Sequence, residues 1–387
     1  MKQVISTEKK PIKLWLEGLE PDVLQQASNL ANLPFTFRHV ALMPDAHTGY
    51  GMPIGGVLAT KGAVIPNAVG MDIGCGMCAV KTNLTDLSTS TMKKIMMGIR
   101  QRIPLGFDWH KEKQDESLMP QRDKLPTIVE QQYKKALLQI GTLGGGNHFI
   151  EIQRGTDNHI WIMIHSGSRN IGKQVADHYN KVAKRLNARW HSQVPSSWDL
   201  AFLPIETNEA HDYLDEMNYC IDFALANRKL MMEFIMEIFH ETINQPVHFF
   251  PMINIAHNYA TWEHHFGENV LIHRKGATRA QENETGIIPG SQGSRSYIVQ
   301  GLGNKESFHS CSHGAGRKMG RRQAQRQLDL QEEIKQLNKQ GIIHAVRNPS
   351  DLDEAPGAYK DIHTVMNNQK DLVKIIEELH PLAVVKG

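Results

Sequence analysis

Residues 40–77 read "VALMPDAHTGYGMPIGGVLATKGAVIPNAVGMDIGCGM", and this stretch indicates what kind of fold the chain adopts. Short apolar runs alternate with glycines and prolines, a pattern typical of short strands joined by tight turns. The stretch closes on an unusual arrangement, in which Asp72 stands three positions before Cys75 and Cys78 follows three positions after it. We therefore expect Gly-rich β segments to carry the residues that do chemistry.

The remaining sequence adds helices to these strands. Apolar periodicity predicts a helix over residues 174–190, one or two helices over 208–244, and a helix from Gly316 to about Gln340. Residues 268–303 return to strands and turns, and the polar residues 109–125 predict a surface loop. The fold class is therefore α+β. No internal repeat or long Ser/Gly linker divides the chain, so we expect a single domain over residues 1–387.

Composition limits the classes of protein that remain. A hydrophobic fraction of 40% and a charged fraction of 22% are ordinary for a globular protein. The formal net charge of +2 gives no bulk argument for nucleic acid, although local patches can still provide one. The sequence has no membrane-length apolar run and no secretion signal, and its four cysteines do not form a disulfide framework. We expect a cytoplasmic protein with no membrane partner.

Histidines stand at the ends of several predicted strands. An apolar run ends at His165 in "HIWIMIHSGSRNIG" and another at His257 in "FFPMINIAHNYA", while "GTLGGGNHFIEI" delivers Asn147 and His148 just before Glu151. One such histidine alone is more often a hydrogen-bonded strand end. Three of them favour convergence on one site, because strand ends hold side chains with little freedom and neutral imidazole is the commonest metal ligand.

The cysteine pair in "MDIGCGMC" (residues 71–78) allows three interpretations. A zinc site needs a second pair of ligands at workable spacing, and none exists. A redox pair needs a helix start in a thioredoxin-like unit, whereas these surroundings are Gly-rich and β-like. In the third interpretation Asp72 and Cys75 join the distant histidines, the thiolate bridges two cations such as Mn²⁺ or Zn²⁺, and Cys78 is not a ligand.

A further cluster occurs in "SFHSCSHGAGRKMGRRQAQRQ" (residues 307–327). His313 precedes small residues that let a phosphate approach the backbone, and a helix start there would favour an anion. Lys318, Arg322 and Arg326 recur every four residues and predict one basic stripe on the following helix. Such a stripe is usually a solvated face, and a phosphate or polynucleotide partner is the alternative. The Gly/Ser turn "GIIPGSQGSRSY" (residues 286–297) lacks the ending of a P-loop.

These blocks, with "MPDAHTGYGMPIGGV", "HRKGAT", "GLGN", "AYKDI" and the terminal "VVKG", occur in one order along essentially the whole chain. In this the chain resembles the RtcB RNA ligases. The resemblance implies the RtcB-like α+β fold, with central β-sheets and helices packed outside. It also implies a ligase that uses GTP and two Mn²⁺ ions. Such an enzyme joins an RNA 3′-phosphate or 2′,3′-cyclic phosphate end to a 5′-hydroxyl end, in RNA repair or tRNA splicing. The steps run through a histidine–GMP intermediate and an RNA-3′-pp-5′-G end.

The resemblance also implies roles for individual residues. The metal ligands fall on Asp72, Cys75, His148, His165 and His257. The histidine that carries GMP falls on His313, and Asp45 matches an active-site aspartate. The implied nucleotide-binding positions are Asn147, His148, Glu151, His257, Asn258, Pro289, Gly290, Ser291, Gln292, Ser296, His313, Gly314, Ala315, Gly316, Tyr359 and Lys386.

Two positions depart from the family pattern, and the same residues are compatible with two rival functions. Gln292 stands where methionine is usual, and Asn170 stands where glycine is common. A dinuclear-metal phosphoesterase would use the same ligands without a guanine pocket or a nucleophilic histidine. A non-catalytic RNA-binding paralogue would keep the cations as structural elements. The sequence specifies neither the natural RNA substrate nor whether an accessory protein takes part.

Overall fold

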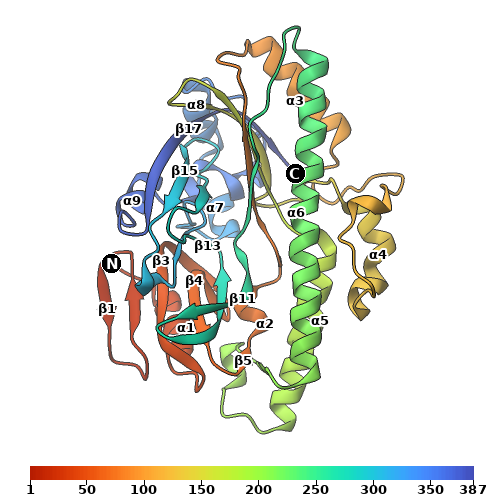
Figure 1. Ribbon diagram of the computed structural model, residues 1–387. Coiled ribbons are helices and arrows are strands. Elements are labelled where there is room, and N and C mark those ends of the chain that lie inside the picture. Colours follow the sequence, from red (N-terminus) through yellow and green to blue (C-terminus); the bar gives the residue numbers. More distant parts are fainter.

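The computed structural model describes residues 1–387, and its strands form two large sheets beside a layer of long helices (Figure 1). The first sheet has six strands in the order β1-β2-β3-β4-β12-β11. Only β2 and β3 pair in parallel. The strands are β1 (Gln3–Ile5), β2 (Ile12–Leu14), β3 (Thr36–Tyr50), β4 (Met52–Thr60), β12 (Glu268–Lys275) and β11 (Asn258–His265).

The second sheet has seven strands in the order β10-β6-β8-β7-β17-β15-β14, and every neighbouring pair is antiparallel. These strands are β10 (Ile253–Ala256), β6 (Gly76–Lys81), β8 (Ile160–Ser166), β7 (Phe149–Gly155), β17 (Val373–Lys386), β15 (Ser296–Gly301) and β14 (Thr285–Ile288). Two short pairs complete the β structure: β5 (Ala63–Val64) with β9 (Leu203–Pro204), and β13 (Ala277–Arg279) with β16 (Ser310–Ser312).

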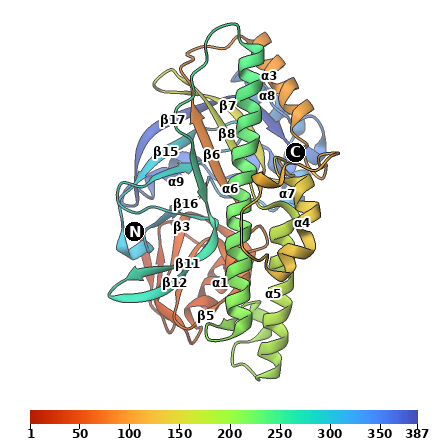
Figure 2. The ribbon, with the colours of Figure 1, turned by 45° about the vertical axis from the view of Figure 1, so that its right-hand side comes forward.

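One long helix supports the second sheet. Helix α6 (Asn208–Thr242) has 35 residues and runs nearly the full height of the molecule (Figure 1). It crosses in front of β6 and β8 in Figure 2 and contacts both. The other helices are α1 (Pro21–Ala31), α2 (Pro66–Val69), α3 (Thr89–Arg102), α4 (Thr127–Gln139), α5 (Arg169–Arg189), α7 (Arg321–Gln327), α8 (Leu330–Lys339) and α9 (Ile362–Asn367). No helix has the length and apolar character that crossing a bilayer requires.

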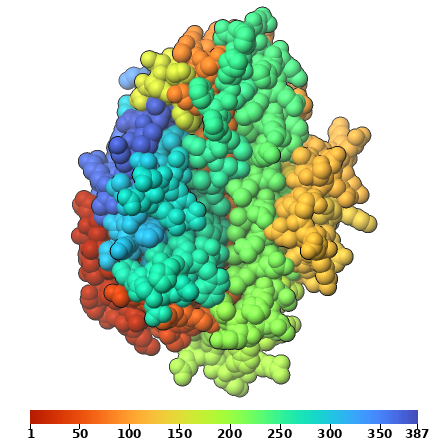
Figure 3. All heavy atoms as spheres, in the orientation of Figure 1, coloured from red at the N-terminus to blue at the C-terminus, as the bar shows by residue number.

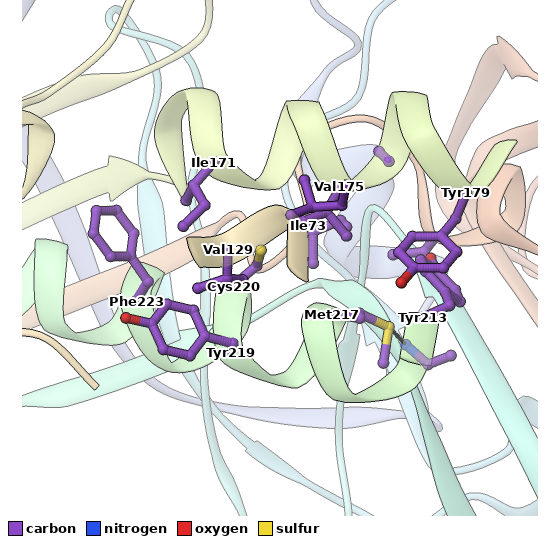
Figure 4. Close-up of a cluster of buried hydrophobic side chains, with 14 of the residues drawn as sticks. Ile73, Val129, Ile171, Val175, Tyr179, Tyr213, Met217, Tyr219, Cys220 and Phe223 are labelled. Carbon is purple, nitrogen blue, oxygen red and sulfur yellow. Dashed lines mark hydrogen bonds between the residues drawn. The ribbon is translucent and has the colours of Figure 1, made fainter. Parts of the chain in front are cut away.

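The core between α5 and α6 anchors the loop that carries Asp72 and Cys75. Ile73, which lies between them in sequence, is fully buried and packs with Val175 of α5 and Cys220 of α6 in one apolar cluster (Figure 4). Burying such a side chain stabilises the fold by about 1.5–3 kcal/mol. The loop is therefore held by its apolar residue, and Cys220 belongs to this core.

Strand register gathers polar side chains on one face of the seven-stranded sheet. Residues that pair directly in antiparallel strands point to the same face. Lys386 pairs with Phe149, Phe149 with His165, and His165 with Met77. Glu151 lies two positions after Phe149, so it shares this face as well. The implied nucleotide and metal residues on these strands therefore project from one face.

Several predicted elements are confirmed. The fold is α+β, the helix predicted at 174–190 corresponds to α5 (residues 169–189), the helical stretch predicted at 208–244 is one helix over 208–242, and 268–303 are strands and turns. Residues 109–125 form a loop with one short 3₁₀ turn, next to α4. The segment around α4 stands out from the side of the molecule in Figure 3.

Other expectations were wrong or incomplete. Residues 316–320 are not helical: Gly316 adopts a φ of 73°, Arg317 bridges to Tyr359, and helix begins only at Arg321. Within residues 40–77 the strands are longer than expected, because β3 alone spans fifteen residues with irregular pairing. The sequence reasoning did not predict α1, α3, α4 or the long strand β17.

Candidate functional site

Two overlapping groups of metal-type ligands share one sulfur. Cys75, His165 and His257 form one group, and Asp72, Cys75 and His148 form the other, with the ligand atoms of each group within 4.8 Å of one another. The Sγ atom of Cys75 lies 3.3 Å from Nε2 of His165 and 3.5 Å from Nε2 of His148. Cys75 therefore offers the same sulfur to both groups, each of which has the residue types and spacing of a metal site.

Strand ends and short loops bring these five residues together. Cys75 directly precedes β6, His165 is the penultimate residue of β8, and His148 directly precedes β7. His257 follows β10, and its backbone N–H donates to the carbonyl of Cys75 at 2.8 Å. Because β10, β6, β8 and β7 are consecutive neighbours in the sheet, four distant segments converge at one edge. The expected convergence of the strand-end histidines is confirmed.

Hydrogen bonds and burial set the state of the imidazoles. Nδ1 of His165 donates to the carbonyl of Asn147 at 3.0 Å, which leaves the Nε2 lone pair for the cluster. Burial, with the neighbouring histidines, lowers the pKa of His165 and of His257 well below the usual value. Both rings are therefore neutral, the form that binds metal. The amide of Asn258 supports the same loop by donating to the carbonyl of Asp72 at 3.0 Å.

The anionic ligands respond to the same burial. Burial alone would raise the pKa of the Asp72 carboxyl, but the hydrogen bond and charge of His148 lower it below the usual value. Burial, followed by the charge of Asp72, raises the pKa of the Cys75 thiol well above its usual value. A coordinating cation deprotonates a thiol outright, so this donor set suits metal binding coupled to proton release.

The second cysteine of the pair points elsewhere. Cys78 lies within β6 and packs in the apolar cluster between the sheet and α6, where its Sγ lies 3.9 Å from the carbonyl oxygen of Arg228. It belongs to neither ligand group, so the two cysteines do not form a shared metal or redox site. All four cysteines of the chain are free.

His313 lies beside this cluster and is held by a buried aspartate. It follows β16, and its ring centroid is 4.9 Å from that of His257. Oδ2 of Asp45 accepts from Nδ1 of His313 at 2.6 Å and from the backbone N–H groups of His313 and Gly314 at 3.0 and 3.2 Å. Burial would raise the pKa of Asp45, but the charge and hydrogen bond of His313 lower it. Since a carboxylate only accepts, Nδ1 carries the proton in this hydrogen bond, so in the neutral imidazole Nε2 has the free lone pair.

A cavity of about 890 Å³ adjoins both His313 and the ligand groups. Most of the implied site residues line it: Asp72, Cys75, Asn147, Glu151, His165, His257, Asn258, Pro289, Gly290, Ser291, Gln292, His313, Gly314, Ala315, Gly316, Tyr359 and Lys386. The remaining three do not line it directly. Asp45 holds His313, His148 contacts Cys75, and Ser296 accepts a hydrogen bond from Gln153 behind Glu151.

One wall of the cavity carries a buried glutamate, Glu151. Burial raises the pKa of Glu151 to about 8, although a 2.6 Å hydrogen bond from Gln153 and the charge of Lys386 oppose the shift. The same burial lowers the pKa of Lys386. These groups therefore offer hydrogen-bonding atoms to a planar polar ligand in a poorly hydrated setting.

A second buried acid was not selected from the sequence. Glu354 accepts from Tyr359, from Arg317 at 3.1 Å and from Lys386 at 3.5 Å. Burial would raise its pKa, but Lys386 and these partners lower it. The backbone carbonyl of Glu354 accepts a hydrogen bond from the side-chain amide of Gln292 at 3.0 Å. Gln292, which stands where methionine is usual in the family, therefore lies in this pocket. A lone glutamate in "DLDEAPG" carries no motif that would have revealed this role.

The predicted basic stripe is only partly a helical feature. Arg322 and Arg326 lie on α7, but Lys318 lies in the preceding non-helical segment, so the three do not share one helix face. All three side chains are exposed, and Lys318 lies at the cavity.

Asn170, the other departure from the family pattern, lies in the first turn of α5 and accepts a hydrogen bond from Gln174. Lys275, a buried cavity residue whose pKa burial lowers to about 7, was also missed.

Comparison with known proteins gives a consistent family assignment. The family model described as tRNA-splicing ligase RtcB matches residues 26–132 and 111–387. The RNA-splicing ligase RtcB of Escherichia coli is 39% identical over 413 residues, which cover 100% of this chain and 99% of the relative. The tRNA-splicing ligase RtcB of Methanococcus maripaludis is 30% identical, covering 97% and 93%, and that of Thermococcus kodakarensis is 30% identical, covering 96% and 92%.

Proposed function

This chain belongs to the RtcB family of RNA-splicing ligases, and from that premise we propose that it joins RNA 3′-phosphate or 2′,3′-cyclic phosphate ends to 5′-hydroxyl ends with GTP and Mn²⁺. The family assignment makes it an enzyme that ligates RNA. The observation that carries the finer proposal is the position of His313 between Asp45 and the paired ligand groups, at the wall of a nucleotide-sized cavity.

His313 is the nucleophile in this proposal. Its Nε2 attacks the α-phosphorus of GTP, a P–N bond forms, and pyrophosphate leaves with the electrons of the broken P–O bond. The Nδ1 proton stays with the imidazole, where Asp45 stabilises the positive charge that develops on the ring. Asp45 therefore acts by orienting and polarising the histidine.

The RNA ends then react in turn. An oxygen of the RNA 3′-phosphate attacks the same phosphorus, the P–N bond breaks, and the RNA carries a GMP-capped 3′ end. The 5′-hydroxyl attacks the 3′-phosphate phosphorus, its proton passes to water, and GMP leaves. A cyclic phosphate must first be opened by water to the 3′-phosphate. The capped end supplies the leaving group that a bare phosphate lacks.

The donor set fits two Mn²⁺ ions. The first group, Cys75, His165 and His257, adjoins the His313 ring; Asp72 and His148 complete the second group through the same sulfur. The carboxylate suits Mn²⁺, the imidazoles and the thiolate also bind ions such as Zn²⁺, and the thiolate would be an anionic ligand common to both groups. Bound cations would offset the negative charge on the reacting phosphates. Four of the five ligand side chains are buried, while the Asp72 side chain is 35% exposed.

Guanine selection is assigned to the wall that carries Glu151. An ionised Glu151 accepts hydrogen bonds from the N1 and N2 groups of guanine, and adenine presents no such pair of donors. Asn147, Tyr359, Lys386 and the turn containing Ser291 complete the proposed pocket and all line the cavity. The remaining implied nucleotide contacts belong to the same proposal. A phosphoesterase with the same metal ligands would have no need of this wall.

The cellular setting belongs to the proposal as well. The relatives' names support an RNA substrate in splicing or repair. We place the reaction in the cytoplasm, which the four free cysteines support, and we keep residues 1–387 as one catalytic domain. The need for an accessory protein is tested by comparing single and multiple turnover of the purified chain.

The decisive experiment supplies defined RNA ends. A 3′-phosphate RNA and a 5′-hydroxyl RNA are incubated with the protein, Mn²⁺ and either GTP or ATP. The proposal predicts joined product with GTP and none with ATP. Release of the 3′-phosphate without joining would instead favour a phosphoesterase.

A further inference from the structure

Arg228 on α6 is a buried cation without a carboxylate partner. Its side chain is fully buried, and it forms no ion pair with any acidic residue. The other fully buried arginine, Arg274, is neutralised by Glu263. Burying an unpaired charge is costly unless hydrogen bonds compensate for the lost water. Packing alone therefore does not explain why an arginine occupies this position.

The guanidinium of Arg228 connects the strand ends that carry the cation ligands. Its Nη1 donates to the carbonyl of Gly74 at 3.0 Å and to that of Ser166 at 2.8 Å. Gly74 directly precedes Cys75, and Ser166 directly follows His165. The Nε atom donates to Oδ1 of Asn254 on β10, three residues before His257, at 2.8 Å. One side chain thus links the ends of β6, β8 and β10.

The neighbouring residue on α6 performs a matching task. Oδ1 of Asn227 accepts from the backbone N–H groups of Gly141 and Thr142 at 2.7 and 3.1 Å. Its Nδ2 donates to Ser166 Oγ and to the carbonyl of Gly167 at 3.2 and 3.1 Å. It therefore ties the start of the Gly-rich loop that delivers His148 to the end of β8. Two consecutive residues of α6 therefore contact all four segments that converge on the ligand groups.

We propose that Arg228 is a positioning residue for the cation cluster, fixing the separation of Cys75 from His165 and His257 so that one sulfur serves both ligand groups. The inference rests on the proposed two-cation function. Only a guanidinium has donors on several nitrogens in a rigid plane, so it bonds both carbonyls and Asn254 at once. Lysine keeps the charge but cannot hold all three acceptors in that geometry.

Metal binding itself, measured without ligation, tests this role. Mn²⁺ is titrated by calorimetry into wild type, Arg228→Lys and Arg228→Met, and Co²⁺ titrations follow the thiolate-to-cobalt charge-transfer band. Residues that orient metal ligands typically contribute 10–100-fold to affinity. We expect wild type to bind two ions, Arg228→Lys to bind one of them at least about tenfold more weakly with a reduced band, and Arg228→Met to be affected more strongly.

Two further variants separate positioning from general stability. Arg274→Lys perturbs a buried arginine away from the cluster, so it should lower the melting temperature without changing Mn²⁺ affinity. Asn254→Ala removes one partner of Arg228 from a half-buried position and should weaken metal binding in the same direction but less strongly. This variant serves as the test if Arg228→Met does not fold.

The outcomes distinguish this inference from the proposed function. If wild type binds no Mn²⁺ pair, the two-cation function fails. If wild type binds two ions and both Arg228→Lys and Asn254→Ala bind them with unchanged affinity and spectrum, the positioning role of Arg228 is wrong. Equal losses in Arg274→Lys would likewise overturn it, because the effect would then follow stability alone.

Discussion

The imidazole of His313 and the carboxylate of Asp45 form a 2.6 Å hydrogen bond between Nδ1 and Oδ2, although 267 residues separate them in sequence. Asp45 is completely buried, and the same oxygen accepts two backbone N–H groups of the turn that carries His313. The side chain and its backbone are thus fixed by one carboxylate, which leaves Nε2 as the reactive nitrogen.

Replacing Asp45 with asparagine tests this relationship. The amide oxygen can still accept the same hydrogen bonds, but the negative charge that stabilises the ring during attack is lost. We expect Asp45→Asn to slow transfer of GMP to the protein by about 10²-fold or more while GTP affinity changes little. Single-turnover labelling and equilibrium GTP binding measure the two quantities. Equal loss of both would mean that Asp45 only maintains the pocket.

Cysteine variants test the shared sulfur. We expect Cys75→Ala to abolish ligation and to lose bound Mn²⁺, because no neighbouring residue can replace a ligand common to both groups. Cys78→Ala should retain both metal content and most activity, since this side chain packs on the α6 side of the sheet. Metal analysis of the two purified variants decides the matter. Equal metal loss would restore the interpretation in which both cysteines bind one ion.

The raised pKa of Glu151 predicts how GTP binding depends on pH. The guanine donors require the carboxylate, whereas a pKa of about 8 leaves the free protein largely protonated at lower pH. Each pH unit below about 8 should therefore weaken GTP binding by roughly tenfold, with a proton released on binding. Isothermal titration in buffers of different ionisation enthalpy measures both effects. A flat profile from roughly pH 6 to about pH 8 would show that Glu151 is already ionised.

As pH rises, ionisation of Glu151 should lower the stability of the protein, whereas it should strengthen GTP binding. Because the folded pKa of Glu151 lies above the unfolded value of 4.5, folding binds a proton between these two values. Its contribution to the free energy of unfolding therefore falls as pH rises from 4.5 to about 8 and then stays low. We expect Glu151→Gln, which has no charge to bury, to melt at a higher temperature than wild type above pH 8 and to lose the pH dependence of GTP binding. Calorimetric melting curves across pH measure the first effect.

The exposed basic residues near the cavity test the RNA path. Neutralising Lys318, Arg322 and Arg326 should weaken RNA joining while sparing transfer of GMP to the protein, because none of them contacts His313. Each lost phosphate contact should reduce the salt slope of RNA binding by roughly 0.7 to 0.9. Neutralising Lys93 and Lys94 on α3 provides a control of similar charge away from the cavity. A slope unchanged in the first variant would make these residues a solvated surface only.

Local sequence patterns predicted the site better than they predicted the fold around it. The strand-end histidines were predictable because apolar runs ending in His, Asn and Gly fix side chains at a sheet edge. The helix expected from Gly316 begins only at Arg321, because Gly316 takes a left-handed conformation and Arg317 pairs with Tyr359, and the pattern of side chains encodes neither feature. Strand β17 was missed because its pattern is interrupted by Pro381 and mixed charges.

Long-range partners escaped the sequence for a different reason. Arg228 and Glu354 lie in unremarkable segments, and their significance comes from what the fold brings against them. The family resemblance assigned Asp45 to the active site without a role, and only its contact with His313 suggests one. Such residues are recognised from burial and partners, which no local motif encodes.

The most direct test of the account follows the covalent step at His313. Wild type and His313→Gln are incubated with Mn²⁺ and GTP radiolabelled at the α-phosphate, and the denatured proteins are analysed for label. The account predicts labelled wild type with the label on His313, and an unlabelled variant that still binds Mn²⁺ and GTP. That variant should also seal RNA whose 3′-phosphate already carries GMP. Label retained by His313→Gln, or joining of ordinary 3′-phosphate RNA by this variant at near wild-type rate, would contradict the account.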